Sequence, residues 1–119
     1  MAKVRRFYFV NLNNIIENST NKPYEDESMC VHIGHSGMLV EFESERKRPG
    51  ELFLTFYHEY NAHSLYLQYR TTSYGKFVEN TDERIVFKTT NSTYIFTVVE
   101  NEMSETEKKL FYLNVFCGN

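Results

Sequence analysis

Short runs in which apolar and polar residues alternate constrain this chain more than any other feature. In "ELFLTFYHEY", residues 51–60, the even positions from Leu52 to His58 carry one set of side chains and the odd positions carry another. Side chains two residues apart lie on the same face of a β-strand. Alternation of this kind recurs along the chain and favours strands over helices.

The stretch 51–70 predicts a hairpin with a two-residue turn at Tyr60-Asn61. This turn brings the apolar sets of both strands to one face, and a shift by one residue would turn one set outward. The expected cross-strand pairs are Phe56 with Leu65, Leu54 with Leu67, Leu52 with Tyr69, and Glu51 with Arg70.

Two further hairpins follow from the same pattern. "SMCVHIGHSGMLVEF" is expected to turn at His35-Ser36, and "RIVFKTTNSTYIFTVVE" at Asn91-Ser92, where Asn tolerates a positive φ. The first hairpin sets Met29, Val31 and Ile33 opposite Phe42, Val40 and Met38. The second sets Ile85, Phe87 and Thr89 opposite Val98, Phe96 and Tyr94.

The remaining segments add strands and little helix. "KVRRFYFVNL", "KFVE" and "KKLFYLNVFC" are expected to be strands, and residues 13–17 a helical turn within a long connection. Ser104 and Glu107 have the spacing of a capping box. We therefore expect a single all-β domain over residues 1–119, an antiparallel meander of about nine strands. Such a meander closes into a barrel or a strongly curved sheet, with a two-layer sandwich as the alternative.

Composition narrows the class of protein. The 119 residues carry a net charge of -3 with mixed signs, which argues against a nucleic-acid partner. No apolar run has the length of a secretory signal or a membrane span, so we expect a cytoplasmic protein in which Cys30 and Cys117 are free thiols. The bias toward Asn, with 5 Gly and 2 Pro, suggests an AT-rich genome such as that of a phage or mobile element.

The histidines are weak candidates for a metal site. The expected register sets His58 opposite His63 at the rim of the core, about 5 Å apart. A zinc site needs three or four ligands, and no third ligand lies near this pair, so we expect no metal and no cofactor. His32 is expected on a strand and His35 in a turn, which argues against a site shared by those two. No Ser or Cys has the neighbours of a catalytic nucleophile, and no catalytic residue is expected.

An aromatic cluster on the outer face of the 51–70 hairpin is the strongest candidate site. Tyrosine is enriched at binding surfaces because its ring supplies large, stiff contact area, although tyrosine also suits strand surfaces that bind nothing. Tyr8 and Tyr112 are expected on the outer faces of the first and last strands. The candidate interface residues are Phe53, Tyr57, Tyr66, Gln68 and Arg70.

These observations predict a non-enzymatic protein that binds another protein, for example a phage-encoded inhibitor of a host protein. A small-ligand carrier with an apolar barrel interior is the first alternative, and a metal-dependent enzyme at the histidines is the second. The sequence is compatible with a homo-oligomer, and no membrane partner is expected.

Overall fold

The computed structural model describes residues 2–45, 48–61 and 66–99. Strands dominate this part of the chain, and its single α-helix is one turn long. The predicted all-β class is thus confirmed. The elements are β1 (Ala2–Glu17), β2 (Lys22–Pro23), α1 (Glu27–Cys30), β3 (Ser36–Ser44), β4 (Leu52–Asn61), β5 (Tyr66–Thr71), β6 (Gly75–Asn80), β7 (Arg84–Thr89) and β8 (Ser92–Val98).

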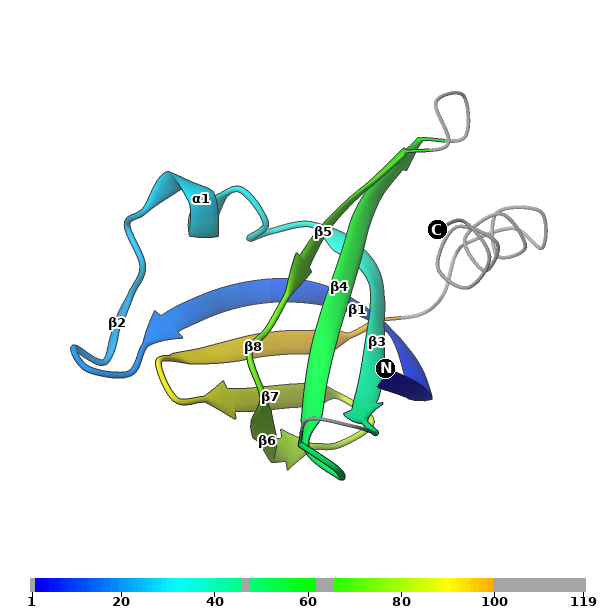
Figure 1. Ribbon diagram of the computed structural model, residues 1–119. Helices are drawn as coiled ribbons and strands as arrows, with labels where there is room; N and C mark the ends of the chain where they lie inside the picture. Colours follow the sequence, from blue (N-terminus) through cyan, green and yellow to red (C-terminus); the bar gives the residue numbers. More distant parts are fainter. Residues whose placement is uncertain (1, 46–47, 62–65, 100–119) are drawn as a thin grey trace.

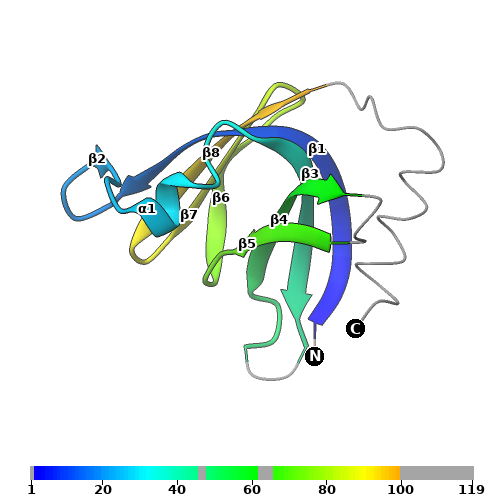
Figure 2. The same ribbon diagram turned by 90° about the horizontal axis from the view of Figure 1, so that it is seen from above.

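Six of the strands close into an antiparallel barrel in the order β1-β3-β4-β6-β7-β8, with β8 returning to β1 (Figure 1). The long strand β1 makes this closure. Its first half pairs with β3, from Ala2 to Asn11, and its second half pairs with β8, from Val10 to Glu17. Bulges within both ladders accompany the bend of β1 around the barrel (Figure 2). The barrel is confirmed, and the sandwich alternative is not.

On the opposite side, one bent stretch of chain joins β4 to the rest of the barrel. The β5 strand pairs with the outer half of β4, and Leu52 at the start of β4 pairs with Gly75 of β6. Thr72 makes the bend, because its amide donates to the Leu54 carbonyl oxygen at 2.8 Å and its Oγ1 accepts from the Leu54 amide at 3.0 Å. From Gly75 onward, β6 turns to pair with β7. We call this junction of β4 and β6 the seam.

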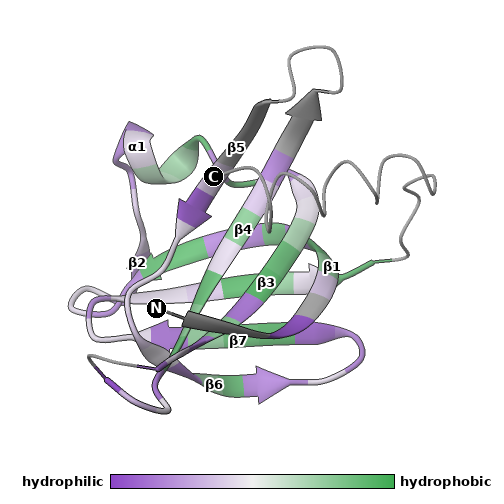
Figure 3. Cartoon of the chain, turned by 45° about the vertical axis from the view of Figure 1, so that its right-hand side comes forward, coloured by the Kyte–Doolittle hydropathy of each residue, from purple (hydrophilic) through white to green (hydrophobic). Residues whose placement is uncertain are grey.

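Side chains fill the interior of the barrel. The apolar faces of its strands meet there, and alternating apolar and polar residues are visible along the strands in Figure 3. The most buried large side chains come from five strands, namely Leu12 and Ile15, Leu39, Leu54 and Phe56, Ile85 and Phe87, and Phe96.

Two predictions about the first third of the chain are wrong. Residues 13–17 continue β1, since β8 offers this stretch a full set of backbone partners. Residues 29–33 do not pair with β3, because β1 occupies that edge of β3. Instead Glu27–Cys30 forms α1, whose Met29 is still buried in the core. Gly34 follows with a φ of 89° and donates its amide to the Leu12 carbonyl oxygen at 2.8 Å.

The predicted β4–β5 hairpin exists, but its register is wrong. Tyr60 and Asn61 belong to β4, and the ladder shifts between His58 and Asn61. Tyr57 therefore pairs with Tyr69, and Phe56 pairs with Arg70. This register turns Tyr69 outward, although the predicted turn placed it in the core.

The β7–β8 hairpin is closer to its prediction. Its loop is Thr90-Asn91, one residue earlier than expected, so that Ile85 pairs with Phe96 and Phe87 with Tyr94. The shift of two residues leaves the same side chains in the core, since side chains alternate with a period of two. The strand after Tyr74-Gly75 is confirmed as β6. The predicted strand 108–117 and the Ser104–Glu107 capping box lie outside the described residues.

Candidate binding surface

The outer parts of β4 and β5 project from the barrel as a two-stranded ribbon (Figure 1). Within the described ranges, β5 pairs with β4 alone. Tyr57 and Tyr69 are cross-strand partners at the base of this ribbon, where Tyr57 also pairs with Met38 of β3, and their ring centroids are 5.8 Å apart. Tyr69 is 60% exposed, so most of its side chain is accessible to a partner. We call these two residues the tyrosine pair.

Phe53 lies on the same strand as Tyr57 but in a different cluster. Its ring stacks on Phe42 at 5.0 Å and meets Tyr74 edge-on at 5.6 Å. Four residues of extended chain separate Phe53 from Tyr57, about 13 Å at the usual rise of a strand. The predicted aromatic cluster is therefore divided, and Tyr69 lies beside Tyr57 where Tyr66 was predicted.

The register also separates the other candidate residues from Tyr57. Arg70 pairs with buried Phe56, Gln68 with His58, and Tyr66 with Asn61. Arg70 thus shares the face of Phe56, and its Nε is buried with no hydrogen-bond partner among the described residues. The expected pair between Glu51 and Arg70 is absent.

Tyr8 also differs from its prediction. It packs against the core, and its hydroxyl donates to the buried Glu41 carboxylate at 3.0 Å. Tyr112 lies outside the described residues.

Burial changes the acidity of Tyr57. Partial desolvation raises the pKa of its phenol above the usual value near 10, and the neighbouring Tyr69 hydroxyl raises the pKa further. A hydrogen bond with Thr55 acts in the opposite direction. The neutral phenol is therefore the favoured form on this ribbon.

Three histidines meet between the α1–β3 connection and β4. His32 Nδ1 and His58 Nε2 are 2.7 Å apart, within hydrogen-bond distance, and the His35 ring stacks on His58 with centroids 4.7 Å apart. His58 is 2% exposed, so it belongs to the core and not to its rim. The expected separation of His32 from His35 is wrong, because residues 31–34 form a turn that brings both rings to His58. His63 lies outside the described residues.

This cluster does not have the geometry of a metal site. Two nitrogen ligands on one tetrahedral zinc lie about 3.3 Å apart, given Zn–N bonds of about 2 Å. The 2.7 Å separation of His32 and His58 instead fits one ring donating a proton to the other. Among the described residues, no group of three or more His, Cys, Asp or Glu side chains is arranged to hold a metal ion.

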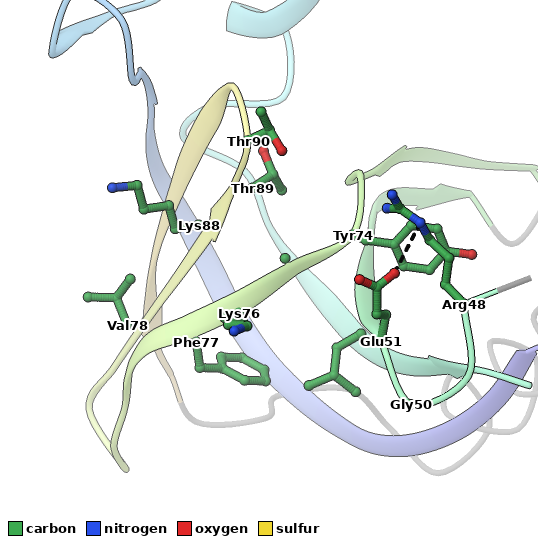
Figure 4. A pocket seen from close by; sticks show the side chains of 12 residues that line it. Arg48, Gly50, Glu51, Tyr74, Lys76, Phe77, Val78, Lys88, Thr89 and Thr90 are labelled. Atoms are coloured by element: carbon green, nitrogen blue, oxygen red, sulfur yellow. Dashed lines mark ion pairs between the residues drawn. The ribbon is translucent and has the colours of Figure 1, made fainter.

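A second candidate site is an open groove at the seam, with a volume of about 810 Å³ (Figure 4). Residues 48–51, just before β4, form one side, where Arg48 forms an ion pair with Glu51 at 3.2 Å and lies over the Tyr74 ring at 5.1 Å. Lys76 of β6 and Lys88 of β7 also line the groove. The sequence pattern does not bring these residues together, because Lys76 and Lys88 are far from residues 48–51 in the chain.

No protein-family model, curated protein or solved structure matches this chain. Within the described ranges, none of the helical structure is long and apolar enough to cross a bilayer. The ribbon, the histidine cluster and the seam groove are therefore the features that bear on function.

Proposed function

We propose that this protein is a small non-enzymatic binding module whose tyrosine pair contacts another protein. The observation that carries this proposal is the 60% exposure of Tyr69 beside Tyr57, at the base of the β4–β5 ribbon that projects from the barrel (Figure 1). Tyrosine is enriched at protein interfaces, and interface energy concentrates in a few such anchors.

The attachment of the ribbon to the barrel supports this proposal. The β4 strand pairs with β3 as far as His58, which pairs with Gly37. Gly37 lets the two strands approach closely, because a Cβ at this position would overlap the Tyr57 carbonyl oxygen. The backbone of Tyr57 is thus fixed before any partner arrives, which lowers the entropy that binding must overcome.

The proposed setting is the cytoplasm of a cell that hosts a phage or mobile element, with the protein acting as an inhibitor of a host protein. The low Gly and Pro content and the frequent Asn support an AT-rich source. Cys30 is a free thiol, which agrees with a reducing compartment.

The test begins with a partner captured by the tagged chain from a lysate of the source organism. We expect Tyr57→Ala and Tyr69→Ala each to weaken the measured affinity for that partner by about thirtyfold, the equivalent of about 2 kcal/mol at an anchor residue. Calorimetry on the purified pair gives this number.

Val78→Ala is the matched control, because Val78 is 66% exposed and lies on β6, away from the ribbon. Its affinity should equal that of the parent chain. If both tyrosine variants bind as tightly as this control, the ribbon is not the contact surface. If the captured partner is a second copy of the chain, the protein acts as a homo-oligomer.

The two alternative functions have less support. Phe56, Phe87 and Phe96 fill the barrel interior, where a carrier would hold its ligand. The histidine cluster gives a metal-dependent enzyme no set of three ligands within the described ranges.

A further inference from the structure

The seam groove carries an excess of positive charge on a negative chain. Arg48, Lys76 and Lys88 line it together with one carboxylate, that of Glu51. The whole chain has a net charge of -3. A concave surface with an excess of one sign of charge attracts ions of the other sign.

The two lysines are direct cross-strand partners. Lys76 pairs with Lys88 in the β6–β7 ladder, and both side chains are exposed. Residues directly opposite each other on one face have Cβ atoms about 5 Å apart, and like charges in this arrangement destabilise a sheet. Neither lysine has an ion pair within the described part of the chain, where the ion pairs belong to Arg5, Arg48 and Arg84. An anion between them would relieve this repulsion.

Arg48 is held in place on the other side of the groove. Its ion pair with Glu51 and its position over the Tyr74 ring restrict a long side chain that would otherwise be mobile. In Figure 4, Lys76 stands between the segments that carry Arg48 and Lys88, and the drawn Lys88 side chain extends away from Arg48. The three cations therefore line the groove from three separate segments.

Apolar surface accompanies these charges. Leu52, Phe77 and Val78 also line the groove. The volume of about 810 Å³ lies within the usual range of small-molecule sites, and the open groove combines apolar surface with a few charged groups. The ligand should therefore have a flat apolar part as well as a negative charge.

We propose that the seam groove binds a small phosphate ester that carries a flat ring. A phosphate monoester has a charge of about -1.5 to -2 at neutral pH, which suits a pair of lysines better than the single charge of a carboxylate. This site is separate from the tyrosine pair, so the proposal does not depend on the ribbon.

The test is calorimetric and NMR titration of the full chain with adenosine monophosphate as the probe. We expect saturable binding, with the largest amide shifts at Gly50, Gly75 and Lys76. Inorganic phosphate and adenosine, each lacking one half of the probe, should bind at least tenfold more weakly. Lys76→Gln and Lys88→Gln should each weaken probe binding by roughly fivefold to tenfold, because each removes one charged contact to phosphate.

Lys22→Gln is the matched control, since it removes one exposed positive charge at β2, outside the groove lining. Its affinity for the probe should not change. The proposal is overturned if adenosine monophosphate shows no saturable binding, or if the Lys76→Gln and Lys88→Gln variants bind as well as this control. Equal binding of adenosine and the nucleotide would also overturn it, because the cations would then play no part.

Discussion

At the scale of single residues, burial distinguishes His58 from the other described histidines. His58 is 2% exposed and packs between the rings of His35 and Phe56, whose centroids lie 4.7 and 5.3 Å from its own. We expect His58→Ala to lower the free energy of unfolding by about 2–4 kcal/mol, because it opens a cavity and breaks the hydrogen bond with His32. Urea denaturation measures this change. His35→Ala, at a half-buried position, is the comparison and should have the smaller effect; the reverse order would contradict this account of the cluster.

Tyr57 gives the protein a sensitivity to alkaline pH. The fold raises the pKa of its phenol above that of the unfolded chain, first by desolvation and then through Tyr69. A raised pKa stabilises the folded state below about pH 10, and this contribution is lost as the pH rises through the folded value. The unfolding free energy of the parent chain should therefore fall more steeply above about pH 10 than that of Tyr57→Phe. Urea denaturation across this pH range measures the unfolding free energy of both proteins. If the two free energies fall in parallel, Tyr57 titrates as it does in the unfolded chain.

At the scale of elements, the pairing of β3 with β4 depends on the absence of a side chain at Gly37. An added Cβ would overlap the backbone of Tyr57, so the two strands would have to separate. We expect Gly37→Ala to cost about 3 kcal/mol of unfolding free energy, the upper part of the range for overpacking.

Gly50→Ala separates this effect from backbone strain. Gly50 has a φ of 81°, and an added Cβ would meet no atom within 4 Å. An alanine there should therefore lower the unfolding free energy only by the cost of a left-handed backbone, about 1–2 kcal/mol. Thermal or urea unfolding of both variants decides the matter. If Gly50→Ala loses more unfolding free energy than Gly37→Ala, β3 and β4 can separate at little cost.

At the scale of the whole molecule, alternation predicted the all-β class and the barrel because it fixes which side chains face inward. Alternation did not predict which strands pair with each other. The second half of β1 pairs with β8, whose sequence is about 80 residues away, and nothing in the local pattern indicates this pairing. The β4–β5 register depends on loop length, and this loop has no strong turn signal such as Asn-Gly.

For the candidate sites too, the sequence pattern predicts features of a single strand but not contacts between distant strands. Tyr57 could be predicted because its strand and face follow from the pattern of β4. Tyr69 was missed because the wrong register reversed its face. The histidine cluster joins residues 26 positions apart, and the seam groove joins three separate segments, so both depend on tertiary pairing.

The dual pairing of β1 has a consequence for biosynthesis. Ribosomes add roughly 5–20 residues per second, so the part of β1 from Leu12 to Glu17 waits several seconds before β8 has been synthesised. During this interval Leu12 and Ile15 lack the neighbour that later covers them. Pairings between distant segments also slow folding after release. The nascent chain thus carries an open, apolar edge through most of its translation, and chaperone binding should concentrate on this first strand.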